Sequence, residues 1–184
     1  MPRSQHCRHR SRRCAPLCGI LLASLLAFLP GLASFAPAHA EEIDWKAGRL
    51  GHLAPTIGTY RYDAVLGDPA VKAALETLVG TDLAAAITAN LTVAGPIDFV
   101  GGHLVLRGIA PHQGGEEEAI VLIKIYDGSL RAALLHEGRM RLFAPDSKYR
   151  YLPPPLKEFV RPRDGAVYPS APPPGVEWLR EPQG

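Results

Sequence analysis

Apolar residues recur at helical spacing most clearly between residues 68 and 80. One face of this stretch carries Val71, Leu75, Leu78 and Val79. Asp68 is a favoured N-cap, Pro69 suits the first helical position, and Gly80 suits the helix end. The pattern predicts a helix between Asp68 and Gly80, followed by a shorter helix from Asp82 to Asn90.

After the second helix, the apolar pattern changes to that of strands. Residues 91–94 and 97–100 are short apolar runs on either side of Gly95-Pro96, and a Gly-Gly pair leads into a third run over residues 103–107. Short apolar runs bounded by Gly and Pro are typical of strands. We therefore expect three short strands in this part of the chain.

The strongest strand signal is Ala119–Tyr126, which is β-branched and apolar on both faces and therefore suits a central strand. Asp127-Gly128 signals a two-residue hairpin turn, and residues 130–136 supply the partner strand. Glu137-Gly138 signals a second turn into residues 139–143. Three consecutive antiparallel strands, with the helices earlier in the chain, predict an α+β fold in which helices pack on one face of an antiparallel meander.

The regions flanking these elements carry fewer periodic signals. Residues 41–66 are expected to form an N-terminal arm that is extended from Thr56 to Tyr62. The α+β domain is expected to cover residues 67–160 and to close with a helical turn at Pro155–Val160.

Residues 161–184 contain six prolines and little that could form a core. Proline-rich segments of this kind adopt extended conformations. We expect a proline-rich tail, held to the domain through Tyr168 or Trp178.

The first forty residues have the composition of an export signal. Five arginines and no acidic residue precede Glu41, an apolar run extends from Gly19 to Leu29, and Ala38-His39-Ala40 is a small-x-small cleavage site. The apolar run is shorter than the about 20 residues that span a bilayer. We expect cleavage after Ala40, export to a bacterial periplasm, and no membrane attachment afterwards.

Removal of this signal changes the charge and the cysteine count. The full chain has 20 Lys and Arg and 18 Asp and Glu, and five of the arginines leave with the signal, so the remainder carries a formal charge of −3. A mildly acidic surface argues against nucleic acid as a partner and suits a basic one. All three cysteines, Cys7, Cys14 and Cys18, also leave, which excludes disulfides, thiolate metal sites and a cysteine nucleophile.

The remaining candidate residues argue against catalysis. Four histidines remain, namely His52, His103, His112 and His136, and no two of them have the spacing of a metal-ligand pair. No serine lies in a nucleophile elbow, and no glycine-rich phosphate loop is present. The run Glu116–Glu118 suits a solvated approach to a strand. We therefore expect no catalytic residues, no metal and no cofactor, and a binding or inhibitory module is favoured over an enzyme.

One connection between two predicted strands has unusual chemistry. Its candidate binding residues are Ala110, Pro111, His112, Gln113, Gly114 and Gly115. Pro111 stiffens the connection and His112 is expected at its apex. On local evidence, the alternative is a polar connection whose histidine simply faces water.

The stretch from His103 to Phe143 resembles the periplasmic inhibitors of vertebrate lysozyme, the Ivy family. Those proteins carry a protruding loop, written C-x-P-H-x-C-G, between two strands. Pro111, His112 and Gly115 stand at the matching positions. The predicted helix before Gly80 is also similar to the family's helix, so the resemblance covers roughly residues 66–160.

The resemblance implies a function and a partner. The family's loop enters the cleft of a lysozyme, where its histidine meets two catalytic carboxylates, so the expected partner is a lysozyme or a bacterial lytic transglycosylase. Members of the family can also form homodimers. The chain departs from the family at the two loop cysteines, where it has Ile109 and Gly114. A loop without a disulfide must be ordered on binding, which costs affinity.

Two other hypotheses remain at this point. The first is a non-inhibitory periplasmic binding or envelope-associated module on the same fold, with the tail or the sheet face as its contact. The second is an enzyme, which would require a deep pocket lined by His103, His136 and carboxylates. A protruding His112 favours inhibition, whereas a loop packed against the domain favours the module.

Overall fold

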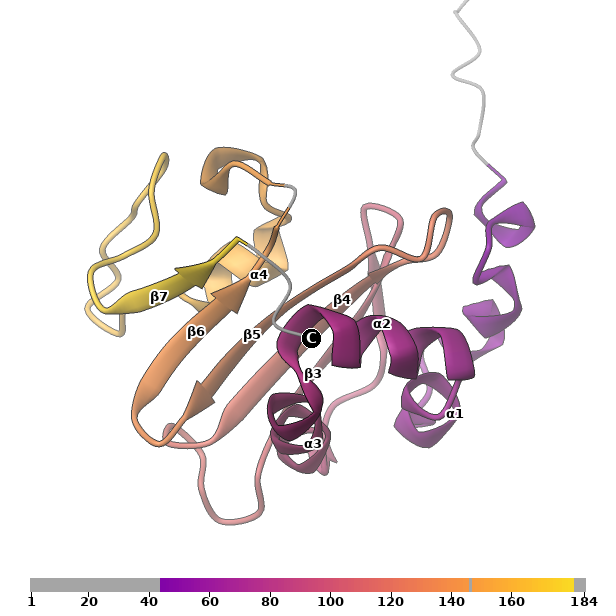
Figure 1. Cartoon of the computed structure of the whole chain (residues 1–184), viewed down its shortest axis with the longest axis horizontal. Coiled ribbons are helices and arrows are strands. Elements are labelled where there is room, and N and C mark those ends of the chain that lie inside the picture. The colour runs from indigo at the N-terminus through magenta and orange to yellow at the C-terminus, as the bar shows by residue number, and fades with distance from the viewer. Residues whose placement is uncertain (1–43, 146, 181–184) are drawn as a thin grey trace, which may run out of the picture. The chain divides into compact units, whose positions relative to one another are not determined.

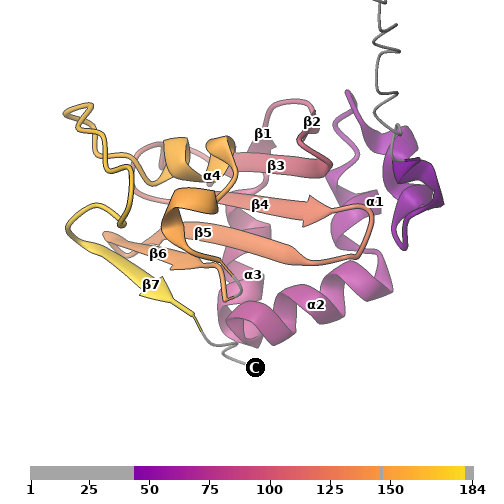
Figure 2. The ribbon, with the colours of Figure 1, turned by 90° about the horizontal axis from the view of Figure 1, so that it is seen from above.

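The computed structural model describes residues 44–145 and 147–180. The expected signal segment and its cleavage site after Ala40 lie outside the described residues. Within them the strands are β1 (Val93–Ala94), β2 (Asp98–Val100), β3 (His103–Ile109), β4 (Glu118–Lys124), β5 (Leu130–His136), β6 (Arg139–Phe143) and β7 (Val176–Leu179). They form one sheet in the order β1-β3-β4-β5-β6-β7, and β2 also pairs with β3 (Figure 1; β1 and β2 are labelled in Figure 2).

The α+β fold is confirmed, and so is the antiparallel meander of β4, β5 and β6. The helices are α1 (Tyr62–Leu66), α2 (Pro69–Val79), α3 (Thr81–Asn90) and α4 (Pro154–Phe159), with 3-10 turns η1 (Trp45–Ala47), η2 (Gly51–Thr56) and η3 (Tyr149–Tyr151). Helices α2 and α3 cover one face of the sheet, as expected, whereas α4 lies on the opposite face (Figure 2).

Helix α2 begins and ends at the predicted residues because its signals are local. One carboxylate oxygen of Asp68 accepts hydrogen bonds from the backbone N–H groups of Ala70 (2.9 Å) and Val71 (3.1 Å). Gly80 follows with φ of 81°, a conformation that glycine adopts without strain. The apolar side of α2 then packs on the sheet.

Two apolar cores fill the space on either side of the sheet. The larger joins α1, α2, α3 and η2 to one face, through residues such as Val65, Ile87 and Val121. The second joins α4 and η3 to the other face, where Leu156 and Phe159 pack on Ile120. No helix among the described residues has both the length and the apolarity needed to cross a membrane.

The hairpin at Asp127-Gly128 is longer than predicted. Strand β4 ends at Lys124, whose N–H donates to the carbonyl of Ser129 (2.9 Å), and the next two residues leave the ladder. Their carbonyls, on Ile125 and Tyr126, instead accept bonds from the N–H groups of Leu50 and Arg49. The prediction of a two-residue turn was therefore wrong, because the N-terminal arm competes for these backbone groups.

The prediction of an extended segment from Thr56 to Tyr62 was wrong, because this segment includes the end of η2 and the start of α1. The expected attachment of the tail through Tyr168 or Trp178 is confirmed, since both side chains pack against the second core. The tail also contains a strand that was not predicted, β7, which pairs in parallel with β6 from Met140↔Val176 to Phe143↔Leu179. Parallel pairing joins segments that are distant in sequence, so no local pattern of residues 161–184 indicated it.

Candidate functional site

The loop between β3 and β4 projects beyond the ends of the strands (Figure 1). Ala110, at its base, is buried, whereas Pro111, His112, Gln113 and Gly114 are exposed. The side chain of His112 makes no hydrogen bond or ion pair with any described residue. Four of the six predicted binding residues therefore form one exposed tip, with a free imidazole on it, whereas Ala110 is buried and Gly115 is half-buried.

Backbone hydrogen bonds fold this tip into two successive turns. The N–H of Gln113 donates to the carbonyl of Ala110 (3.1 Å), and the N–H groups of Glu116 and Glu117 both donate to the carbonyl of Gln113 (3.0 Å). His112 has φ of 63°, as at the third position of a type II turn, with Pro111 before it. Residues other than glycine adopt positive φ infrequently, although histidine does so more often than most.

Glu117 holds one side of the loop to the end of the sheet. Its carboxylate accepts bonds from His136 Nδ1 (2.6 Å), the Glu137 backbone N–H (2.9 Å) and Asn90 Nδ2 (3.3 Å). Burial alone would raise the pKa of this carboxyl, but the three donors outweigh it, so the pKa of Glu117 lies below its ordinary value. The carboxylate is therefore ionised at neutral pH and accepts three hydrogen bonds.

Gly115 is held through both of its backbone groups. Its N–H donates to Oε1 of Glu118 (2.7 Å), and its carbonyl accepts from Nη2 of Arg163 (2.9 Å). Arg163 lies just after α4, 48 residues along the chain. We refer to Glu117, Glu118 and Arg163 as the loop brace.

The acidic run was predicted to be a solvated approach to β4, and for two of its three residues this was wrong. Glu117 is 17% exposed and bonded to three partners, and Glu118 bonds the loop backbone. Glu116 alone is exposed. Two of these carboxylates therefore hold the loop in shape.

Ile109 and Gly114, at the positions of the two cysteines in the resembling family, lie side by side. A Cβ placed on Gly114 would lie 3.5 Å from Cδ1 of Ile109, which is ordinary van der Waals contact. The Ile109 side chain therefore lies beside Gly114, where the resemblance implies a disulfide. Without a covalent link at this place, the loop brace is what reduces the conformations that the loop can adopt.

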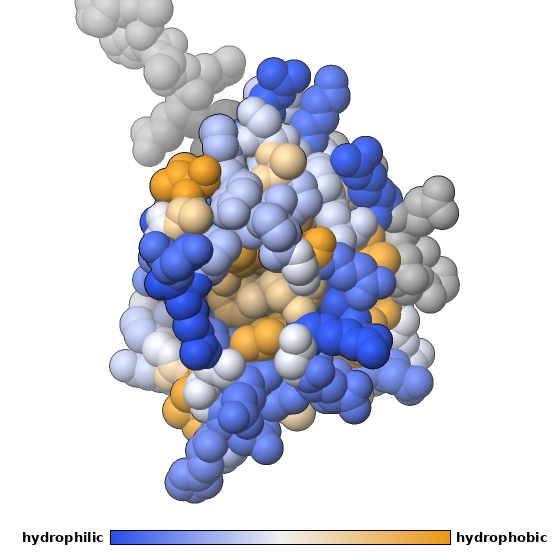
Figure 3. Space-filling model, turned by 90° about the vertical axis from the view of Figure 1, so that its left-hand side faces the viewer, coloured by the Kyte–Doolittle hydropathy of each residue, from blue (hydrophilic) through white to orange (hydrophobic). Residues whose placement is uncertain are grey.

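A groove of about 420 Å³ lies beside the loop. Arg163 and Glu118 line it together with Phe159 of α4, Met140 of β6 and Val176 of β7. Figure 3 shows this side of the molecule, which is hollowed and has an apolar floor. The sequence did not indicate the groove, because it depends on the pairing of β7 with β6.

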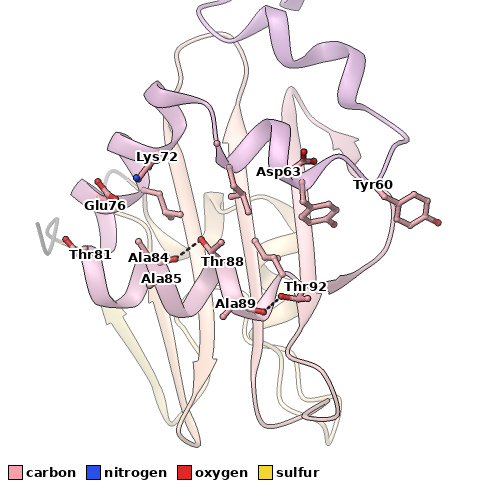
Figure 4. A pocket seen from close by; sticks show the side chains of 15 residues that line it. Tyr60, Asp63, Lys72, Glu76, Thr81, Ala84, Ala85, Thr88, Ala89 and Thr92 are labelled. Atoms are coloured by element: carbon pink, nitrogen blue, oxygen red, sulfur yellow. Dashed lines mark hydrogen bonds between the residues drawn. The ribbon is translucent and has the colours of Figure 1, made fainter.

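A larger groove, with a volume of about 920 Å³, lies between α1, α2 and α3 (Figure 4). Lys72 and Glu76 of α2 line it, and Tyr60 lies at its edge. The hydroxyl groups of Thr88 and Thr92 donate to carbonyls of the same segment, those of Ala84 and Ala89 respectively. No histidine lines this groove in the described chain, and no residue of the β3–β4 loop does.

The histidines of the enzyme hypothesis lie apart. His103 begins β3 and pairs with Lys124, whereas His136 ends β5 beside the loop. Burial is the main cause that lowers the pKa of His103, and its Nδ1 bonds the carbonyl of Gly101. Among the described residues there is also no group of three or more His, Cys, Asp or Glu that could hold a metal ion.

Comparison with known proteins identifies one family. The model of the family described as inhibitor of vertebrate lysozyme (Ivy) matches residues 70–164, which run from α2 through the β3–β4 loop to the segment after α4. Neither the curated proteins nor the solved structures contain a match to this chain. The matched region includes every residue of the tip and of the loop brace.

Proposed function

The chain belongs to the family of inhibitors of vertebrate lysozyme, and on that premise we propose that it blocks a peptidoglycan-cleaving glycosidase by placing the β3–β4 loop in the enzyme's active-site cleft. The observation that carries the proposal is the free, exposed side chain of His112 at the tip of a projecting loop. The protein then acts as an inhibitor and not as an enzyme.

The chemistry of such a cleft suits a neutral imidazole. A retaining glycosidase places two carboxyl groups about 5 Å apart, one protonated and the other ionised. A neutral imidazole has one nitrogen that donates and one that accepts. His112 can therefore donate to the ionised carboxylate and accept from the protonated acid, so that it occupies both groups without a covalent step.

The loop brace lowers the cost of binding. A loop that is already close to its bound shape loses less conformational entropy when it enters a cleft. Glu117 and Arg163 attach the loop to β5 and to the segment after α4, on two different sides. Because these contacts involve no cysteine, we propose that inhibition does not depend on the redox state of the surroundings.

The projecting loop favours inhibition over a non-inhibitory module on the same fold. A module that binds through its sheet face or its C-terminal segment would not require an exposed imidazole on an ordered tip. We further propose that the protein is exported and acts in the periplasm, which follows from the sequence of its first forty residues. Its target would then be an incoming animal lysozyme or a bacterial lytic transglycosylase.

The test is a panel of purified peptidoglycan-cleaving enzymes that includes animal lysozymes and lytic transglycosylases. Each is assayed for the rate at which it clears a peptidoglycan suspension, with and without the protein. We expect the protein to inhibit at least one of them and to co-purify with it from a mixture. If none is inhibited at any concentration tested, the proposal is wrong, and the non-inhibitory module becomes the better account.

A further inference from the structure

A second pocket, separate from the loop, opens between η3 and the C-terminal end of β7. Its volume is about 470 Å³. The seven residues that line it are Ser147, Lys148, Tyr149, Arg150, Ser170, Trp178 and Arg180. Three of these seven side chains are cationic, and no carboxylate of the described chain lines the pocket.

Charge is unevenly distributed along the chain, and the pocket lies in its basic part. Residues 131–184 carry nine Lys and Arg against six Asp and Glu, whereas residues 41–130 carry six against twelve. Within residues 44–145 and 147–180, Lys148, Arg150 and Arg180 form no ion pair. Since residues 41–184 together have 15 Lys and Arg and 18 Asp and Glu, a cationic pocket among them is not explained by overall composition.

The neighbouring groups orient hydrogen-bond donors in the pocket. Arg131 Nε donates to Oγ of Ser147 (2.9 Å), which leaves the hydroxyl hydrogen of Ser147 free to donate. The guanidinium of Arg180 lies over the Trp178 ring, 4.2 Å from its centroid. Stacked in this way, a guanidinium retains N–H groups for an anion.

Trp178 also lines the pocket. Its Nε1 is buried and has no acceptor among the described residues. Because this atom is covered by protein, it is not itself a ligand-binding donor. Its N–H lies in the lining of the pocket and can report on what binds there.

We propose that this pocket binds a phosphate group. Phosphate carries up to two negative charges and has oxygens that point in several directions, which suits donors that come from three separate segments of the chain. A carboxylate is planar and can be bound by a single guanidinium fork. The pocket is open to solvent, so the phosphate would belong to a larger molecule, either a soluble sugar phosphate or a lipid headgroup.

The first experiment uses glucose 6-phosphate as the probe, with glucuronate as the carboxylate control. Binding is followed by NMR through the indole N–H resonance of Trp178, which is assigned from its loss in Trp178→Phe. We expect a saturable shift with the phosphate and a much weaker response to the carboxylate. Absence of a saturable shift, or an equal response to both compounds, would overturn the proposal.

Variants locate the site. In the double variant Arg150→Gln/Arg180→Gln, we expect affinity for the phosphate to fall at least about tenfold, since two charge-assisted hydrogen bonds are lost. The matched control is Lys72→Gln, which removes an exposed cation on α2, across the sheet. It should bind as the parent does. An equal loss of phosphate affinity in the double variant and in Lys72→Gln would mean that the phosphate is attracted non-specifically by charge, and would overturn the proposal. Thermal unfolding of each variant shows whether the fold is kept.

A second arm distinguishes the source of the phosphate. Sedimentation is measured with vesicles of phosphatidylcholine alone and with vesicles that also contain phosphatidylglycerol. Binding to the anionic vesicles that disappears in the double variant identifies a lipid headgroup. Binding to glucose 6-phosphate without sedimentation identifies a soluble ligand. Sedimentation that is unchanged in the double variant would contradict the assignment of the site.

Discussion

Nη2 of Arg163 donates a hydrogen bond to the carbonyl of Gly115 over 2.9 Å, and this bond attaches the tip of the β3–β4 loop to the segment that follows α4. The guanidinium also lies so close to Gly115 that a Cβ there would collide with it. Arg163 is thus a positioning residue for the loop and not itself part of the exposed tip.

Arg163→Ala should therefore weaken inhibition without unfolding the protein. We expect the inhibition constant to rise about three- to tenfold, the cost of one partly exposed hydrogen bond from a charged donor. The matched control is Arg161→Ala, because the side chain of Arg161 makes no hydrogen bond to the loop. Both variants should keep the Tm of the parent to within about 2 °C, since exposed substitutions change stability little. An equal loss of inhibition in the two variants would show that Arg163 does not position the loop.

Glu117→Gln tests the other side of the brace through its dependence on pH. Because the folded protein holds the pKa of Glu117 below its ordinary value of 4.5, the carboxylate stabilises the fold above that pH. This stabilisation is lost as the pH falls through the lowered pKa. At neutral pH the variant should be less stable by about 1–3 kcal/mol, the scale of hydrogen bonds to a charged group.

Urea unfolding of the parent and of Glu117→Gln across the acidic range measures this difference. The difference in free energy of unfolding should be constant near neutral pH and should shrink once the pH is below 4.5. Glu116→Gln, an exposed neighbour in the same run, serves as the control and should show little difference at any pH. If the difference in free energy of unfolding between the parent and Glu117→Gln stays constant down to strongly acidic pH, the assigned role of the carboxylate is contradicted.

Removal of the chain after Arg163 should lower the Tm markedly. The truncation deletes β7, and with it the burial of Val176 and Trp178 against the second core. A loss of about 3 kcal/mol corresponds to about 10 °C in a domain of this size. Trp178→Ala should give part of this drop, whereas Val167→Ala should give none, since Val167 is 72% exposed. An unchanged Tm after truncation would mean that β7 contributes no stability.

A disulfide between positions 109 and 114 should tighten inhibition. The side chain of Ile109 already reaches Gly114, and Gly114 does not have the positive φ that would disfavour a side chain. In Ile109→Cys/Gly114→Cys, the oxidised form should inhibit a few-fold more strongly than the reduced form, because the bond removes loop conformations. The gain should stay small, since the loop brace already orders the loop. The reduced protein is its own control, and equal inhibition by both forms would show that preorganisation does not limit binding.

The parts of the fold that local sequence determines were predicted, and the parts that depend on distant contacts were not. Helix α2 was placed correctly because Asp68 and Gly80 signal its ends within the same stretch of chain. Strand β7 was missed because its partner, β6, lies more than thirty residues earlier. The tip of the loop could be predicted from the sequence, because Pro111 and His112 are chemically distinctive wherever they lie in the fold.

The loop brace could not be predicted. Its bonds join Glu117 to His136 and Gly115 to Arg163, which lie 19 and 48 residues apart. A glutamate within an acidic run carries no local sign that it will be bonded to a histidine on another strand. The sequence therefore indicates the tip that we propose to enter the cleft, but not the residues that hold this tip in place.

The role of His112 is tested most directly by the dissociation constant of the complex with the inhibited enzyme, measured for the parent, His112→Ala and His112→Asn. Asparagine also tolerates positive φ, so it keeps the backbone of the turn while removing the imidazole. Gln113→Ala, at the next exposed position, is the control.

Both His112 variants should bind the enzyme more weakly by about 1.5–3 kcal/mol, or roughly ten- to more than a hundredfold, because hydrogen bonds to charged carboxylates are lost. Their Tm should stay close to that of the parent, and Gln113→Ala should bind within about threefold of it. If His112→Ala and His112→Asn bind and inhibit the enzyme as tightly as the parent, the imidazole does not occupy the catalytic carboxylates, and the proposed mechanism of inhibition is wrong.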